Sequence, residues 1–585
     1  MSDRRIIAVV PFGTRGGDER AGAWARQLAR RLIDRSPATD HLELRPVFLV
    51  AMPDGPAGAG HLILGSTPTA DLAAQYGASL GATHAVVGTL VDDAGARRLD
   101  AALVDVASKT SIEERSFPIP AGELHRAEAA IGAWIASALG AGAPVDAAPA
   151  AANETAYAAL LEAMDEEVNA TLLRAGDAAR SDASLHAALD GYVASALADP
   201  ASSVAEDRLL VLAAEALERG DVGHEIGALE RLVSERSRSW RVHYMLGQLR
   251  SETADTNGAI LAFEHAHALH PLPDTDLVRL AELYANAGAV APGLAHLRRI
   301  APASAAYGSA QELLAIIAFQ RGDLEAGAQA FDRAIAAGTD SWELHAARAA
   351  ADHARGDTAV AAEQYRLALA RGGPGVVRLN LARIELAAGE RASAERELDA
   401  LLASERIGEV ACHARRLRFG LREPELERDL EHAGQAALSG DAAALDPSRA
   451  TFERALAIEP DLWEAHFGLG IVARQRADAA AAKSAFAKVL ELWPDQPDAL
   501  HELGVALLMN EETNAALRAL DRAAALRPDD AAYVADAGFA HLRAGNLDTA
   551  RRHLERASGI DANDPITKSY VGELLRVEGE AGKRR

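Results

Sequence analysis

Three consecutive stretches decide the fold: FGLGIVARQRADAAAAKSAFAKVLELWP (467–494), HELGVALLMNEETNAALRALDRAAALRP (501–528) and ADAGFAHLRAGNLDTARRHLERASGIDA (535–562). A small residue recurs every 34 residues, at Gly470, Gly504 and Gly538. Other landmarks keep the same interval: Ala482, Ala516 and Ala550, then Phe486, Leu520 and Leu554. A fixed period of this length indicates repeated pairs of short helices, which bury their apolar faces only by stacking on the next pair.

The same small position continues upstream at intervals of 34 residues, and once 33: Ala213, Gly247, Ala281, Ala315, Ala349 and Ala382. The period then breaks, because Ala382 and Gly470 are 88 residues apart where two repeats would need 68. We predict an additional helix over 408–421, followed by a repeat with an elongated turn whose second helix begins at Asp446-Pro447. The break is either a hinge or a local bulge in the superhelix.

This pattern resembles the tetratricopeptide repeat (TPR), and the resemblance covers most of 205–565. It implies a right-handed superhelix in which the first helix of each repeat lines a concave groove. The predicted fold class is therefore α+β overall: a small N-terminal α/β domain followed by an all-α right-handed TPR superhelical solenoid.

The N-terminal region lacks the 34-residue period and has alternating strand and helix patterns instead. RIIAVVPF (5–12) is a near-continuous apolar run, typical of a strand that is buried on both faces. We predict further strands over 42–50, 83–93, 97–107 and 111–120, helices over 18–35, 69–81 and 121–139, and a Gly- and Pro-rich loop over 51–66. Together these segments resemble the TolB N-terminal-like domain, which is found in bacteria beside TPR arrays.

Gly16-Gly17-Asp18-Glu19 has the letters that begin the signature of enzymes making cyclic dinucleotides. Such a signature lies on a hairpin well inside a domain, whereas only fifteen residues precede this one. The simpler interpretation is that the glycines turn the chain and the acidic residues begin a helix, where the helix dipole favours negative charge. We predict that turn and no enzyme.

Composition excludes several classes of protein. The net charge of −25 argues against binding to nucleic acid or to an anionic membrane, because both require a cationic surface. Cys412 is the only cysteine, so no disulfide can form within the chain, which suits a reducing compartment. No stretch reaches the roughly 18 apolar residues of a spanning helix. We expect a cytoplasmic protein with no nucleic-acid and no membrane partner.

No motif indicates catalysis, and we predict no catalytic residue, no cofactor and no metal. His265, His267 and His270 lie close in sequence, but only the last two share a helix face. HELGV (501–505) lacks the second histidine of a zinc protease motif, and the loop 51–66 lacks the lysine of a phosphate loop.

The residue types at the groove positions indicate the kind of partner. The first-helix positions of the groove lack the Lys, Arg and Asn array that grips a peptide carboxylate, and the last three repeats place apolar residues there instead, so we expect a protein or peptide partner with an apolar segment. The candidate partner-binding residues are Tyr244, Phe319, Phe467, Ile471, His501, Val505, Leu508, Phe539 and Leu542. Some of these residues could instead pack between hairpins.

The sequence thus favours a scaffold or adaptor in a bacterial signalling or assembly complex. One alternative is a sensor: a small molecule binds at the N-terminal domain, and the effect of binding is transmitted through the array. Another alternative is an enzyme built on that domain. The oligomeric state stays open. The expected domains are a TolB N-terminal-like domain (1–142), a linker (143–155), a helical cap (156–204), a first part of the array (205–403), an inserted helix (404–428), a second part of the array (429–565) and a capping helix with a tail (566–585).

Overall fold

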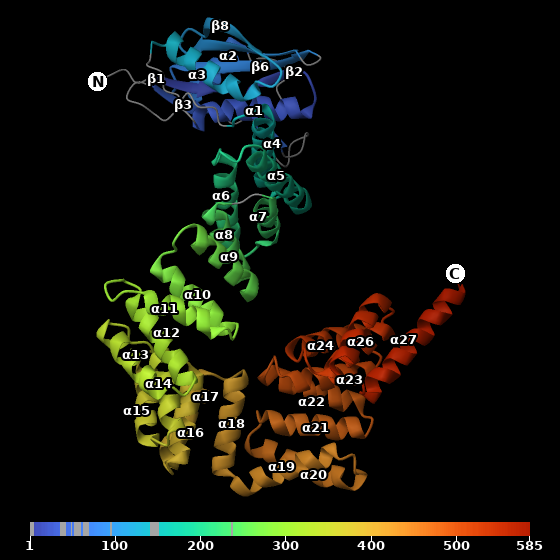
Figure 1. Cartoon of the computed structure of the whole chain (residues 1–585). Helices are drawn as coiled ribbons and strands as arrows, with labels where there is room; N and C mark the ends of the chain where they lie inside the picture. The colour runs from blue at the N-terminus through green and yellow to red at the C-terminus, as the bar shows by residue number, and fades with distance from the viewer. Residues whose placement is uncertain are drawn as a thin grey trace. The chain divides into compact units, whose positions relative to one another are not determined.

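The computed structural model describes residues 5–34, 42–47, 50–51, 60–61, 69–93, 96–140, 151–235 and 238–584 (Figure 1). The chain divides into two units, Met1–Arg299 and Ile300–Arg585. A small mixed sheet begins the first unit, and helices form the rest of the first unit and all of the second.

The sheet has the strand order β3-β1-β6-β7-β8, and β2 also pairs with β6. β1 runs parallel to β3 and β6, whereas β6, β7 and β8 are antiparallel neighbours. Its strands are β1 (Arg5–Val9), β2 (Gly13–Gly16), β3 (Leu42–Pro46), β6 (His84–Asp93), β7 (Ala96–Asp105) and β8 (Thr110–Ile119). The predicted strand 42–50 is therefore shorter than expected. Most of the predicted loop 51–66 lies outside the described residues, but a short strand within it, β5 (Gly60–His61), pairs antiparallel with β4 (Val50–Ala51).

Helices cover both faces of the sheet, because alternate strand residues point to opposite sides. Ile7 and Val9 face α1 (Glu19–Asp34) and α3 (Ala127–Ala138) in one apolar cluster. Ala8 and Val10 pack instead against α2 (Ala70–Ser79). A short 3-10 turn, η1 (Leu124–Arg126), precedes α3. The expected three helices of this region are all present.

The Gly-Gly-Asp-Glu stretch is a turn. Gly16 and Gly17 have φ angles of 76° and 77°, and a Cβ atom on Gly16 would lie 2.3 Å from the carbonyl oxygen of Asp92. Asp18 then accepts a hydrogen bond from the backbone N–H of Ala21, and Glu19 begins α1. The structural interpretation of these four residues is confirmed, because the glycines adopt a left-handed conformation that side chains disfavour.

The sheet region and the first helices share one core. α4 (Glu154–Leu173) and α5 (Ala178–Ala198) form a hairpin, and α4 packs on α1. Arg26 on α1 pairs with Asp165 on α4 at 2.6 Å, and the two side chains are only 7% and 6% exposed. Buried apolar residues continue from the sheet as far as α9. Of the predicted linker, 143–150 lie outside the described residues, and Ala151, where the description resumes, is buried.

The repeats are helical hairpins in both units. In the first unit they are α6 (Val204–Arg219) with α7 (Gly223–Glu235), α8 (Trp240–Glu252) with α9 (Thr256–Leu269), and α10 (Asp274–Asn286) with α11 (Val290–Arg299). In the second unit they are α12 (Tyr307–Gln320) with α13 (Leu324–Ala336), α14 (Trp342–Ala354) with α15 (Thr358–Ala370), α16 (Gly375–Ala387) with α17 (Arg391–Ser404), α19 (Pro424–Leu438) with α20 (Ala442–Ile458), α21 (Trp463–Gln475) with α22 (Ala479–Leu492), α23 (Pro497–Met509) with α24 (Thr513–Leu526), and α25 (Ala531–Arg543) with α26 (Leu547–Ile560). α27 (Pro565–Arg584) follows the last hairpin, as the predicted capping helix.

One prediction for the break in the period is wrong. The turn between α19 and α20 is short, because α20 begins at Ala442 and Asp441 accepts a hydrogen bond from the N–H of Ala443. Pro447 therefore lies inside α20 and does not begin it. Pro447 is the sixth residue of α20, so the helix continues through it without the hydrogen bond that an N–H there would donate to the carbonyl oxygen of residue 443.

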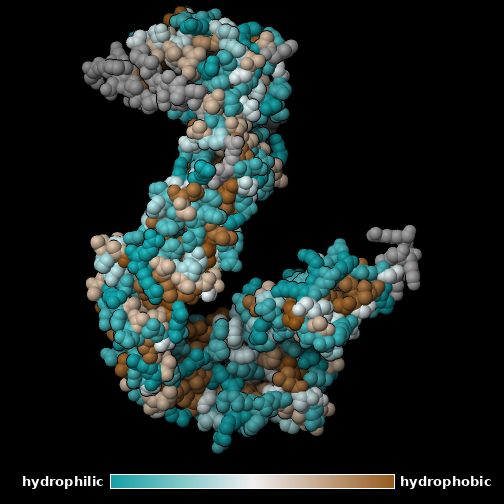
Figure 2. All heavy atoms as spheres, viewed as in Figure 1, coloured by the Kyte–Doolittle hydropathy of each residue, from teal (hydrophilic) through white to brown (hydrophobic). Residues whose placement is uncertain are grey.

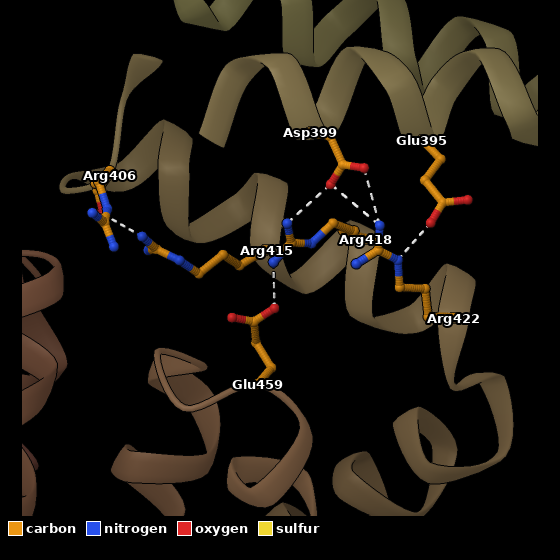
Figure 3. A network of polar contacts seen from close by, with 7 residues as sticks. All are labelled: Glu395, Asp399, Arg406, Arg415, Arg418, Arg422 and Glu459. Atoms are coloured by element: carbon orange, nitrogen blue, oxygen red, sulfur yellow. Dashed lines mark hydrogen bonds and ion pairs between the residues drawn. The ribbon is translucent and has the colours of Figure 1, made fainter. Parts of the chain in front are cut away.

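The additional helix predicted over 408–421 is α18 (Glu409–Arg422). It packs against α16 and α17 as the first helix of a further repeat would, but the next hairpin starts afresh at α19. Arg418 on α18 forms hydrogen bonds with the hairpins before and after this helix (Figure 3). It donates to Asp399 on α17 at 3.0 Å and to Glu459 after α20 at 2.5 Å. The N–H of Gly408 donates to the carbonyl oxygen of Leu492 at the end of α22, at 2.7 Å. The break is thus a helix clamped between two stacks of hairpins.

Candidate functional site

An apolar pocket opens on the first helices of the second stack. Its volume is about 180 Å³. The apolar lining comes from α19, α20 and α21: Leu430, Ala437, Leu438, Phe452, Trp463, Phe467 and Ile471. Leu438 is 61% exposed, so an apolar side chain at the rim of the pocket is open to solvent. Figure 2 shows that apolar patches of this kind interrupt a mostly hydrophilic surface.

Two glycines make room for the pocket. A Cβ atom on Gly468 would lie 2.3 Å from the ring of Phe452, so glycine lets this ring pack directly on the backbone of α21. A Cβ atom on Gly434 of α19 would meet no atom within 4 Å, so the space above it is open. The hollow is therefore built by residues of the repeat itself.

Charged residues border the apolar lining. Burial raises the pKa of Glu464 to about 7, against the opposing effects of Arg416 and the Trp463 indole. Arg416 is held by Glu427 at 2.7 Å and by Glu431 at 3.3 Å. The Glu431 side chain is 60% exposed, so one carboxylate faces solvent at the rim of the pocket. The pocket can thus take an apolar group that is followed by a cation.

Phe467 and Ile471 are the two predicted residues that meet at this pocket. Phe467 is half-buried, with its ring 5.4 Å from that of Phe486, while Ile471 is only 1% exposed and forms part of the wall. Val505 and Leu508 on α23 and Phe539 on α25 are half-buried along the following repeats.

Phe319 and Leu542 correct the predicted groove, because both are buried in the core of the array and, unlike Ile471, neither lines the pocket. Phe319 is 8% exposed and lies over Gly327, where a Cβ atom would come within 2.4 Å of its ring. Leu542 is 6% exposed among the last helices. These positions of the first helix face the second helix and the neighbouring hairpin, not the groove.

His501 joins neighbouring first helices. Its Nε2 lies 2.7 Å from a carboxylate oxygen of Asp536, which also accepts a hydrogen bond from the hydroxyl of Tyr570 at 2.9 Å. Burial lowers the pKa of His501, but the hydrogen bond and charge of Asp536 outweigh it and the pKa is raised. Tyr244 in the first unit is engaged in the same way, since its hydroxyl donates to Asp276 on the next first helix at 3.2 Å. Both predicted residues therefore hold repeats together.

Sequence reasoning missed the α19 wall of the pocket. Leu430 and Leu438 were outside the predicted groove because the break hid the register of their repeat. Trp463 begins α21, and its ring lies 6.2 Å from that of Phe467. The signal that could have found them was the 34-residue period counted backwards from Gly470.

The histidines predicted to be ordinary helix residues face separate neighbours. His265 lies 5.3 Å from the ring of His243, His267 5.4 Å from His296, and His270 stacks on Trp240 at 4.6 Å. A different trio, Asp521, His541 and His553, comes together from α24, α25 and α26 among the described residues. A carboxylate oxygen of Asp521 lies 3.1 Å from Nε2 of His541, within hydrogen-bond distance, and 4.0 Å from Nε2 of His553, beyond it.

Comparison with known proteins gives solved structures only. No protein-family model matches the chain, and no curated protein matches it. The crystal structure of MamA is 22% identical, with a TM-score of 0.21, and the match covers 24% of this chain and 92% of that chain. The MamA RS-1 ArsTM double mutant is 19% identical, with a TM-score of 0.22, and that match covers 32% of this chain and 94% of that one.

The fold and the repeat period together define the class. The chain is a TPR-like helical solenoid that is preceded by a small N-terminal mixed-sheet domain. Within the part of the chain that the structure describes, no helix has the length and apolar character needed to cross a membrane.

Proposed function

We propose that this chain is a non-enzymatic scaffold or adaptor whose first helices bind a partner peptide or helix. The observation that carries the proposal is the apolar pocket between α19 and α21, where Phe467 and Ile471 meet. The pocket is smaller than the roughly 300–1,000 Å³ typical of small-molecule sites, so it suits a single large side chain of a peptide. Helical-repeat arrays use such surfaces to hold partners by shape.

The partner's chemistry follows from the lining and from the charge. Burying one Leu- or Phe-sized side chain contributes about 1.5–3 kcal/mol. The exposed carboxylate of Glu431 and the net charge of −25 favour Lys or Arg next to that apolar residue. The proposed partner segment is therefore an amphipathic helix or extended peptide with an apolar anchor and a basic flank.

The wider assignment is also part of the proposal. The domain limits are those given by the repeat period, and the sheet region is a TolB N-terminal-like domain. The protein acts by binding, without a cofactor, in the cytoplasm of a bacterium, within a signalling or assembly complex. Val505, Leu508 and Phe539 extend the surface beyond the pocket.

Peptide selection on the full chain tests the pocket. Peptides are selected by phage display, and the affinity of the best one is measured by fluorescence polarisation. Leu438→Asp places a charge at the rim of the pocket, and Leu575→Asp is its matched control, because Leu575 on α27 is 62% exposed and Leu438 is 61% exposed. Both substitutions are expected to leave folding intact.

The expected result is a consensus of an apolar anchor beside Lys or Arg. The affinity should fall at least tenfold for Leu438→Asp, as the loss of about 1.4 kcal/mol requires, and should be unchanged for Leu575→Asp. Equal binding by both variants, or a selected consensus that is acidic, overturns the proposal.

A further inference from the structure

The first unit contains a second and larger cavity, of about 580 Å³. It lies where α1 meets α4, α5 and α6, beside the carboxyl ends of the parallel strands β1 and β3. Its size falls in the range of small-molecule sites. Ligands of open α/β sheets bind outside the carboxyl ends of the strands, which is the position of this cavity.

Apolar residues line the cavity from the sheet and from three helices. Val9 and Val47 come from the sheet, Ile33 from α1, Met164 and Val168 from α4, and Val211 from α6. Val211 is 43% exposed, and it belongs to the helix that begins the repeats. A molecule in this cavity would contact the sheet domain and the first repeat at once.

Arginines dominate the polar part of the lining. The carboxylates there have close cations: Glu167 accepts from Arg208 at 2.8 Å, Asp34 from Arg30 at 3.2 Å, and Asp207 from Arg241 at 2.6 Å. Arg31 has no partner as close, because the nearest carboxylate oxygens, on Asp34 and Glu128, are both 3.9 Å away.

The guanidinium of Arg31 is buried, and its hydrogen bonding is incomplete. The residue is 9% exposed, and among the described residues its Nε atom has no hydrogen-bond partner. Its ion pairs with Asp34 and Glu128 are both 3.9 Å long, too long for hydrogen bonds, whereas a ligand carboxylate or phosphate at Nε would add a charge-assisted hydrogen bond. The lining thus offers an apolar volume with one poorly compensated cation at its edge.

We propose that this cavity binds a small amphipathic anion. Its apolar body lies between α1 and α4, and its single anionic group pairs with Arg31. Because the ligand contacts both the sheet domain and α4–α6, its binding stabilises their packing by mass action. The inference is independent of the peptide site, which lies in the other unit.

Fluorescence titration of the full chain tests the proposal. The probe is 11-(dansylamino)undecanoic acid, and its methyl ester is the uncharged counterpart. Decanoate and decyl phosphate serve as competitors, so that carboxylate and phosphate heads are distinguished. Arg31→Gln removes the cation, Arg31→Lys keeps it, and Val168→Phe fills the cavity.

Two control variants lie elsewhere. Arg126→Gln changes a side chain of the sheet domain that is 67% exposed, and Val360→Phe changes an exposed valine on α15. Circular dichroism confirms that each variant is folded before titration.

We expect saturable binding of the acid, weaker binding of the ester, and at least tenfold weaker binding of the acid by Arg31→Gln and Val168→Phe. Arg31→Lys should bind more tightly than Arg31→Gln, and the two controls should match the unchanged chain. Absence of saturable binding, or affinities that Arg31→Gln and Val168→Phe leave unchanged, overturns the proposal.

Discussion

Gly504 shows at the residue scale why the period is kept. A Cβ atom there would lie 2.4 Å from Leu520 on the second helix of the hairpin. A Cβ atom on the equivalent Gly470 would lie 2.5 Å from Phe486. The missing side chain lets the two helices of a hairpin approach, and the large residue fills the space. Small and large positions therefore recur together along the array.

Gly504→Ala should destabilise the second unit by about 1–3 kcal/mol, because the added methyl group overpacks the hairpin. Gly572→Ala is the control in the middle of α27, where a Cβ atom would meet nothing within 4 Å and alanine should stabilise by about 0.5–1 kcal/mol. Urea unfolding of the full chain measures both changes. A stabilising Gly504→Ala would contradict the close approach.

Glu464 predicts a dependence of stability on pH. Burial raises its pKa to about 7 in the folded chain, above the ordinary 4.5, so the unfolded chain releases this proton first. The folded state therefore loses stability as pH rises from about 4.5 to 7, by roughly 3 kcal/mol for a shift of this size.

Glu464→Gln should remove that contribution and should raise the melting temperature at pH 8 more than at pH 5. Glu431→Gln changes an exposed carboxylate at the same pocket and serves as the control. Differential scanning calorimetry at the two pH values makes the comparison. A melting temperature of Glu464→Gln that follows the unchanged chain at both values would show that this carboxyl is not buried.

At the scale of elements, the strongest periodic signals predicted the fold. The repeated small residues placed the hairpins, and the apolar run at 5–12 placed the first strand. Pro447 misled the prediction, because a proline favours a helix start but does not require one. The period counted backwards from Gly470 reaches α19, but it does not predict that Leu430 and Leu438 form a pocket with α21, because that depends on how the hairpins pack.

Arg418→Ala should loosen α18. The side chain is 18% exposed and bridges Asp399 and Glu459, so its loss leaves Glu459, which is 16% exposed, without this cation, at a cost of about 1–3 kcal/mol. Arg422→Ala is the control on the same helix, because Arg422 also meets two carboxylates but is 45% exposed and contributes less than about 1 kcal/mol.

Hydrogen exchange of the full chain measures this difference. Amides of α18 and of the end of α20 should exchange faster in Arg418→Ala and should be unchanged in Arg422→Ala. Equal protection in both variants would mean that the clamp depends on apolar packing alone.

For the whole molecule, the sheet domain is not a separate module. Arg26 and Asp165 pair inside a core that runs from the sheet to the first repeats. A buried pair of this kind fixes which surfaces meet, because either charge alone would be costly.

Asp165→Asn should lower the free energy of unfolding of the first unit by about 3–5 kcal/mol, because the substitution leaves the buried Arg26 without its anion. Asp190→Asn on α5 is the control, since Asp190 is 50% exposed in its pair with Arg231. Chemical denaturation followed by circular dichroism compares the two. Similar midpoints for both variants would show that the buried pair does not hold the domain to α4.

Solenoid repeats normally touch only their neighbours, so unravelling can start at an end and proceed one hairpin at a time. The hydrogen bond from Gly408 to Leu492 joins residues that are 84 positions apart and encloses α18 and the hairpins α19–α22 in one closed loop. Fraying of those hairpins must therefore wait until the loop is released, and this part of the array should melt as a single cooperative block.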